Sequence, residues 1–264
     1  MLDRLSVVRD KLLDRANVSH GDTVLDVGCG EGLIGFGALA RGAARAIFCD
    51  ISDDLLASCH EAAEELGVAD RCQFIVSGAE NLSETDDAAV DVVTTRSVLI
   101  YVAEKRHAFE EFFRVLRPGG RISLYEPINR FAVRDDEATR FWGYPSDGLA
   151  ELATKIQAVY DAIQPESDPM LDFDERDLLR LAEGTGFFPV ELELQAEIRR
   201  TEPQSFEVFL NSAGNPKIPT FAEAMDRALT VEERERVAEY LRPLVEEGGG
   251  VWRMAHAYLL GMKT

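Results

Sequence analysis

The sequence predicts an α/β protein with a doubly wound, mostly parallel sheet, and three observations lead to this fold class. Short β-branched and apolar runs alternate with amphipathic helical runs over the first two-thirds of the chain. A glycine-rich turn directly follows the first of the apolar runs. Two long stretches without strand character then interrupt the alternation, which is typical of insertions into such a sheet.

The expected sheet has seven strands, with the last one antiparallel. A helix comes first, because Leu5, Val8 and Leu12 recur at helical spacing. Ser52 is expected to cap a later helix that Gly67 ends. A helix over residues 103–116 is expected to stop at the Pro-Gly-Gly turn, residues 118–120. The strands are expected at residues 23–27, 46–49, 73–76, 90–95, 121–126, 188–196 and 251–262.

Composition and charge limit the function classes. Lys and Arg total 28 against 48 Asp and Glu, so the formal net charge of −20 argues against nucleic acid as a partner. No run approaches the roughly 18 apolar residues of a membrane helix, and no signal peptide is evident, so no membrane partner and a cytoplasmic location are expected. The four cysteines lack metal-ligand spacing, which favours reduced packing cysteines. We predict no metal.

The most specific signal is the stretch Val-Leu-Asp-Val-Gly-Cys-Gly-Glu-Gly, residues 24–32. Glycines after a strand allow a ligand to approach the backbone, and the following helix offers free N–H donors. Asp50 ends the next strand about 20 residues further on, where the ribose of a nucleoside would be received. Asp26 lies at the tip of the first strand, where a carboxylate favours a cationic ligand.

The same region contains a rival pattern. Residues 30–35, Gly-Glu-Gly-Leu-Ile-Gly, match the dinucleotide fingerprint GxGxxG, which is typical of NAD-binding proteins. The match begins two residues beyond the glycine that ends the strand, and it leaves Asp26 unexplained. A methyl donor with an ammonium and a sulfonium accounts for Asp26 better than a pyrophosphate does.

Residues 26–32 resemble the first motif of the class I, Rossmann-like S-adenosylmethionine-dependent methyltransferases. Four later segments are similar to further motifs of that family in the same order: Asp50, residues 77–82, residues 90–99 and residues 114–120. The resemblance covers residues 22–127 well and residues 173–196 moderately. It implies an enzyme that transfers a methyl group from S-adenosylmethionine and releases S-adenosylhomocysteine.

The resemblance also implies the roles of individual residues in donor binding. Gly28 and Gly30 would approach the methionine moiety, with Asp26 near its amino group. Asp50 would bind the ribose and Ile51 would pack on the adenine. Ala79 and Glu80 would line the other side of the adenine. Arg96 would contact the donor from the loop after the fourth strand, although Arg is unusual at this position.

The break in the alternation of strands and helices divides the chain into a core and a lid. Residues 1–127 would form the cofactor-binding half, 173–196 its continuation and 250–264 the last core strand. The insertions, residues 128–172 and 197–249, are expected to form a helical lid over the carboxyl edge of the sheet. Trp142 and Tyr144 would either line an acceptor pocket or pin the lid to the core.

The acceptor is expected to be a small molecule, whose identity the sequence leaves open. Tyr101 and Glu126 are the candidate catalytic residues, because they lie at the carboxyl ends of the fourth and fifth expected strands. Packing of Tyr101 on the next helix and a strand-end cap at Glu126 are the structural alternatives, and His107 is expected to face solvent. Two alternative functions remain open: a donor-binding protein without methyl transfer, and an NAD(P)-dependent oxidoreductase. A homodimer is possible with any of these functions.

Overall fold

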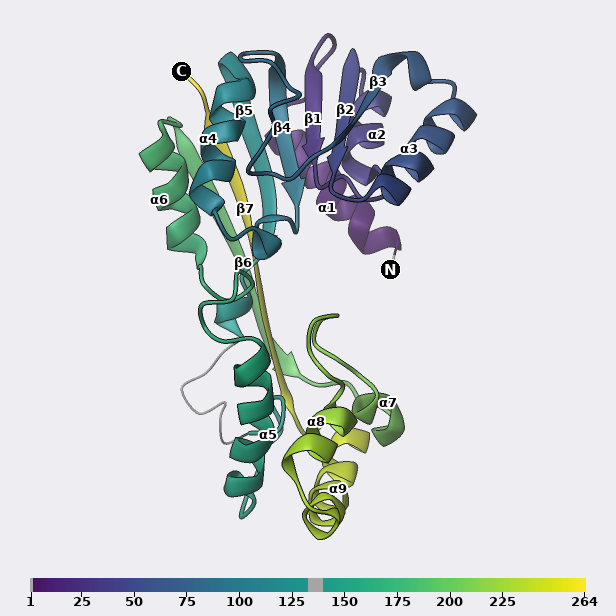
Figure 1. The fold of residues 1–264 in the computed structure, drawn as a ribbon, viewed down its shortest axis with the longest axis vertical. Coiled ribbons are helices and arrows are strands. Elements are labelled where there is room, and N and C mark those ends of the chain that lie inside the picture. The colour runs from purple at the N-terminus through teal and green to yellow at the C-terminus, as the bar shows by residue number, and fades with distance from the viewer. Residues whose placement is uncertain (1, 133–139) are drawn as a thin grey trace. The chain divides into compact units, whose positions relative to one another are not determined.

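The computed structural model describes residues 2–132 and 140–264, and its central feature is a seven-stranded sheet in the order β3-β2-β1-β4-β5-β7-β6 (Figure 1). Strands β1 to β5 pair in parallel, and β7 pairs antiparallel with β5. The predicted doubly wound sheet is therefore confirmed. The strands are β1 (Thr23–Val27), β2 (Arg45–Asp50), β3 (Cys72–Val76), β4 (Val90–Arg96), β5 (Leu116–Pro127), β6 (Val190–Arg200) and β7 (Val251–Met262).

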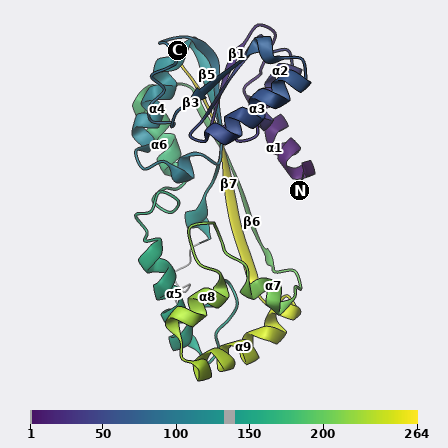
Figure 2. The ribbon, with the colours of Figure 1, turned by 45° about the vertical axis from the view of Figure 1, so that its right-hand side comes forward.

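Helices cover both faces of the sheet, because alternate residues of its buried strands are apolar on both sides. On one face lie α1 (Leu2–Arg15), α2 (Leu33–Ala40) and α3 (Asp53–Glu65), and Leu12 packs there with Val24 and Val92. The other face carries α4 (Lys105–Val115) and α6 (Glu175–Thr185) (Figures 1 and 2). The rings of Phe109 and Phe187 meet on this side. Short 3₁₀ turns occur at η1 (Ala69–Arg71), η2 (Leu99–Tyr101) and η3 (Asn129–Phe131).

Local sequence signals set the ends of α3 as predicted. The Ser52 hydroxyl accepts a hydrogen bond from the Leu55 amide at 3.4 Å, which satisfies one free donor of the first turn. Gly67 follows the helix with a φ of 67°, the left-handed conformation that glycine adopts without strain. The cap and the stop are both confirmed.

The start of β5 differs from the expectation. We expected a turn at residues 118–120 before the strand, but the strand begins at Leu116, which pairs with Val90. The register shifts between Val90 and Val92, and the Gly119 amide donates to the Lys263 carbonyl at 2.6 Å. The Pro-Gly-Gly segment is thus an irregular part of the sheet, held by two backbone hydrogen bonds of Gly119 and Gly120 to Lys263, just beyond the end of β7.

The chain divides into two compact units. The first contains residues 1–128, 173–195 and 256–264, and the second contains residues 129–172 and 196–255. The helices of the second unit are α5 (Ala150–Ile163), α7 (Phe206–Leu210), α8 (Phe221–Ala228) and α9 (Val231–Glu246). No helix among the described residues is long and apolar enough to cross a membrane.

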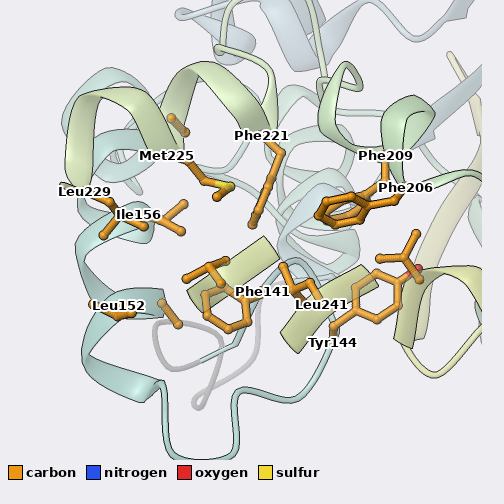
Figure 3. Close-up of a cluster of buried hydrophobic side chains, with 14 of the residues drawn as sticks. Phe141, Tyr144, Leu152, Ile156, Phe206, Phe209, Phe221, Met225, Leu229 and Leu241 are labelled. Carbon is orange, nitrogen blue, oxygen red and sulfur yellow. The ribbon is translucent and has the colours of Figure 1, made fainter. Parts of the chain in front are cut away.

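The second unit has a hydrophobic core of its own (Figure 3). Phe209 and Phe221 lie at its centre with their ring centroids 4.7 Å apart. Tyr144 is 1% exposed in this core, and Trp142 packs against Tyr160 with a centroid separation of 5.3 Å. Tyr144 is therefore a packing residue of this unit, and its predicted role in lining an acceptor pocket is not supported by its burial.

Candidate functional site

The loop between β1 and α2 has an unusual backbone. Gly28, Gly30 and Gly32 have φ angles of 64°, 55° and 77°, which residues with a Cβ rarely adopt. A Cβ on Gly30 would meet no atom within 4 Å, so the loop borders open space at this point. A Cβ on Gly28 would overlap the Val98 side chain, so the loop after β4 packs directly against it. A ligand could approach the backbone at Gly30.

Asp50 joins this loop to the end of β2. Its Oδ2 accepts the Gly30 amide at 2.9 Å, and its Oδ1 accepts the Ser52 amide at 3.0 Å. The carboxylate is only 8% exposed, yet each oxygen keeps a second lone pair for a further donor. Asp50 is thereby held in one orientation and can still accept hydrogen bonds from a ligand's hydroxyl groups.

An apolar and an acidic side chain meet beside Asp50. Ile51 is 79% exposed, which is unusual for a large apolar residue next to a buried strand. A Cβ on Gly78 would lie 3.1 Å from the Glu80 Oε2 and 3.9 Å from the Ile51 Cγ2, so both side chains border one spot. Ala79 is 3% exposed and turns inward, so of the predicted pair only Glu80 offers its side chain to a ligand.

Asp26 lies beneath the loop. Its Oδ2 accepts the Gly35 amide at 2.9 Å and its Oδ1 accepts the Thr94 hydroxyl at 3.1 Å. Burial raises the pKa of this carboxyl to about 7, against the lowering effect of those two hydrogen bonds. Asp26 therefore joins β1 to the first turn of α2 and to β4, and its predicted closeness to a ligand's amino group remains a prediction.

Packing explains the GxGxxG match. A Cβ on Gly35 would overlap the Phe48 ring of β2, so a glycine is needed for α2 to lie close to the sheet. The Gly35 amide is bonded to Asp26. Gly35 is thus required for helix packing. The last glycine of the GxGxxG match is therefore explained without a bound dinucleotide.

The segment after β4 is held by Glu126. Ser97 has a φ of 60°, and the Val98 amide donates to the Glu126 Oε1 at 3.1 Å. The Thr95 hydroxyl donates to the same oxygen at 2.8 Å. Glu126 therefore fixes the path of the chain from the end of β4 to the turn that presses Val98 against Gly28.

Glu126 is 0% exposed. Burial raises the pKa of this carboxyl to about 7, because ionisation without water is costly and the hydrogen bonds from Thr95 and from the backbone of residues 98–100 offset it only in part. The strand-end cap that we kept as an alternative describes this position, and the buried side chain does not support a direct role on the acceptor. Tyr101 is 53% exposed in η2, and its catalytic role remains a prediction.

Arg96 is the last residue of β4. Its side chain is partly buried and lowers the pKa of Asp26 by its charge. Its guanidinium makes no hydrogen bond or ion pair to the residues that the structure describes. A cation held at the carboxyl edge of the sheet is suited to a carboxylate of a ligand.

Two other features lie outside this group. His107 is exposed on α4, as expected. A cavity of about 280 Å³ lies at the opposite, amino edge of the sheet, where it is lined by Thr23, Arg45 and Arg71 among others. Over residues 2–132 and 140–264, no three His, Cys, Asp or Glu side chains are placed to hold a metal ion.

Two residues of the same edge were missed from the sequence. His256 begins the part of β7 that pairs with β5, and its ring stacks on Tyr125. We read both as members of strands without a role at the site. Their alternation with Tyr258 and Ser123 along two neighbouring strands was the available signal, but the register of β7 against β5 was unknown.

The fold and site define a class of protein, and comparisons with known proteins give the same class. Residues 24–120 match the family model described as a methyltransferase domain. A putative methyltransferase from Bacillus halodurans has the same fold, with a TM-score of 0.59 at 20% identity over 97% of this chain and 98% of that one. The chain therefore carries a methyltransferase domain of the class I, S-adenosylmethionine-dependent type, as predicted.

Curated relatives match part of the chain. It is 38% identical over 115 residues to a tRNA 5-carboxymethoxyuridine methyltransferase of Escherichia coli, covering 42% of this chain and 44% of that protein. It is 33% identical over 142 residues to a ubiquinone/menaquinone biosynthesis C-methyltransferase of Salmonella arizonae, covering 52% and 56%. The chain thus matches about half the length of these relatives, and their acceptors differ from one another.

Proposed function

We propose that this protein transfers the methyl group of S-adenosylmethionine to a small-molecule acceptor and releases S-adenosylhomocysteine. The observation that carries the proposal is the grouping of the open loop at Gly30, the oriented Asp50 carboxylate and the exposed Ile51 at the carboxyl ends of β1 and β2. Ligands of open α/β sheets bind at this edge. The methyltransferase domain of residues 24–120 contains all three.

The described residues fit the chemistry of this donor. Asp50 has free lone pairs for two hydroxyl groups of a ribose, and Ile51 offers an apolar face to a purine beside the Glu80 carboxylate. Gly28 and Gly30 would lie along the methionine moiety, and Arg96 would hold its carboxylate. Asp26 is buried, so it would act on the amino group indirectly, by holding the loop and the first turn of α2 in place.

When bound, the donor supplies a methyl group on a positively charged sulfur. Displacement at that carbon disperses charge, so the protein contributes chiefly by alignment of the two reactants. Glu126 serves this alignment, since it holds the segment after β4 in place against Gly28. We propose that Tyr101, exposed in η2, faces the acceptor.

The charge of the chain supports a small molecule as the acceptor. A net charge of −20 repels a polyanion such as tRNA, although one relative is named as a tRNA methyltransferase. Methylation assays with total tRNA and with a metabolite extract separate these two classes. We also propose a cytoplasmic location, and a homodimer remains an alternative to a monomer.

We also propose the division of labour along the chain that the sequence indicated. Residues 1–127, 173–196 and 250–264 would serve the donor, and the insertions 128–172 and 197–249 would act as a lid that selects the acceptor. The insertions lie outside the matched domain of residues 24–120, so they can differ between enzymes that share the donor.

The experiment that tests the proposed function is a turnover assay with labelled S-adenosylmethionine and a metabolite extract. Release of S-adenosylhomocysteine that depends on the extract supports methyl transfer. Donor binding without such release would favour a donor-binding protein that has lost the chemistry. Failure to bind the donor at all would contradict the assignment of the site.

A further inference from the structure

A row of aromatic and basic side chains lies on the α1 side of the sheet, next to the proposed donor site. Arg96 is the register partner of Tyr125, Tyr125 of Tyr258, and His256 of Pro127. Side chains two residues apart on a strand share a face, and Arg96 follows Thr94, which bonds Asp26. The row therefore runs from the end of β4 across β5 to β7, entirely within the first unit.

The rings of this row are packed against one another. Tyr125 and His256 stack with their centroids 5.1 Å apart and their planes 15° apart. Tyr258 meets Tyr125 at 4.9 Å, and the Lys11 Nζ of α1 lies 4.3 Å above the Tyr258 ring. Stacking on Tyr125 restricts the orientation of the His256 imidazole, which is the condition for a defined hydrogen bond to a ligand.

The His256 ring nitrogens make no hydrogen bond to the residues that the structure describes. Partial burial lowers the pKa of His256, so the imidazole is neutral at pH 7 and has one nitrogen that accepts a proton. Tyr125 of β5 is the titratable group that contacts the His256 ring. The other charged or titratable groups of this row lie beyond Tyr125: Arg96 of β4 and Tyr258 of β7 are beside Tyr125, Lys11 of α1 lies over Tyr258, and Glu193 of β6 pairs with Lys11.

We propose that His256 is the general base of the methyl transfer and that the acceptor is a flat molecule with a phenol- or enol-type hydroxyl. The inference rests on the proposed function. Of the acid–base groups at this edge, Glu126 is buried on the opposite face, whereas His256 is partly exposed and beside an aromatic surface. A hydroxyl of this kind must lose a proton to become a strong nucleophile, which a carboxylate need not do.

The step balances without a further reactant. The acceptor's hydroxyl oxygen attacks the methyl carbon while its proton moves to the free nitrogen of His256. The bond between carbon and sulfur breaks, and its electron pair stays on the sulfur of the departing S-adenosylhomocysteine. The imidazolium then returns its proton to water, so His256 is regenerated.

The test uses the full-length protein and a panel of catechol, phenol, 4-nitrophenol, 1,3-cyclohexanedione, benzoate and benzylamine. His256→Gln should lower the rate of transfer to phenol or catechol by at least 100-fold, the range of general-base catalysis. The loss should be smaller for the more acidic 4-nitrophenol, which ionises without help. The wild-type rate with phenol should rise with pH and level off once His256 has lost its proton, whereas the rate of the variant should rise only as the phenol itself ionises. His60→Gln, an exposed histidine on α3, is the matched control and should change nothing.

Donor affinity separates this inference from the proposed function. Calorimetry with S-adenosylhomocysteine should give the same affinity for His256→Gln and wild type. Two results with the wild type would overturn the proposal: transfer only to benzoate or benzylamine, and no transfer to any hydroxyl although the donor binds. Two results with His256→Gln would also overturn it: an unchanged rate, and an equal loss of rate for every phenol. A wild type that does not bind the donor would instead refute the proposed function.

Discussion

Asp50 and Gly30 are joined by a hydrogen bond of 2.9 Å between the Gly30 amide and the Asp50 Oδ2, although 20 positions separate them in the chain. The bond connects the end of β2 to the loop that follows β1. Any donor that lies on this loop is therefore also next to the Asp50 carboxylate. One residue sets the path of the loop and offers hydrogen-bond acceptors to the ligand.

Asp50→Ala should weaken donor binding by about 1.5–3 kcal/mol, because the charge-assisted hydrogen bonds to the ribose are lost. Asp50→Asn is the matched variant, since its amide oxygen can still accept one backbone bond. It should lose less affinity than Asp50→Ala. Calorimetric titration with S-adenosylhomocysteine measures both, and an unchanged affinity in a folded Asp50→Ala protein would refute the role of Asp50.

Gly28→Ala should abolish detectable donor binding and destabilise the protein. The left-handed φ of 64° costs a residue with a Cβ about 1–2 kcal/mol, and the added Cβ overlaps Val98. The contact with Val98 predicts that the segment after β4 must move to accommodate the added Cβ.

The pair Gly28→Ala and Val98→Ala tests this contact. If overlap with Val98 contributes to the loss, the double variant should be destabilised by less than the sum of the two single variants. Urea unfolding of all four proteins gives the four free energies. Strict additivity would indicate that the backbone conformation alone requires the glycine.

Glu126→Gln should flatten the pH dependence of stability. The pKa of Glu126 is raised from 4.5 to about 7 in the folded protein, so between these values the folded state binds a proton that the unfolded state has released. The contribution of Glu126 to the free energy of unfolding is complete below pH 4.5 and falls as the pH rises to about 7, by about 1.4 kcal/mol per pH unit for one proton.

The measurement is urea unfolding at pH 5, 6, 7 and 8 for wild type and Glu126→Gln. The free energy of unfolding of wild type minus that of Glu126→Gln should decrease as the pH rises from 5 to 7 and then level off above pH 7. Asp26 follows the same sign, because its pKa is also raised to about 7, so wild type retains part of the slope. A constant difference from pH 5 to pH 8 would mean that Glu126 is ionised throughout.

Much of the fold could be predicted because it depends on local patterns. The parallel strands are continuous apolar runs, and Ser52 and Gly67 carry the signals that begin and end α3. The start of β5 was wrong, because Pro118 and the two glycines after it form a turn in most contexts. Here the register of β5 against β4 shifts at this segment, so that it stays within the sheet. This pairing is a tertiary effect that the local sequence does not reveal.

The site could be predicted only in part. Gly30 follows β1 and Asp50 ends the neighbouring strand β2, so their closeness is a consequence of the topology of a parallel sheet. The burial of Asp26, Ala79 and Glu126 depends on side-chain direction and on packing from helices, which a motif does not specify. His256 was missed because its neighbour Tyr125 lies 131 positions earlier, and their contact depends on the register of β7.

Trp142→Ala should lower the stability of the protein by about 3 kcal/mol while leaving donor affinity within about threefold. The indole packs on Tyr160, Phe209 and Phe221, so truncation leaves a cavity in the core of the second unit. Trp142→Phe is the control and should cost less. Thermal unfolding and donor calorimetry measure the two effects, and a large loss of donor affinity in a folded Trp142→Ala protein would contradict the assignment of donor binding to the first unit.

Calorimetric titration of the wild-type protein with S-adenosylhomocysteine, S-adenosylmethionine and NAD tests the central claim most directly. We predict binding of both sulfur nucleosides at one site per chain and no binding of NAD. Asp50→Ala should weaken binding of both sulfur nucleosides. Binding of NAD without either sulfur nucleoside, or no binding of any of the three by the folded protein, would contradict the claim that Gly30, Asp50 and Ile51 form a site for a methyl donor.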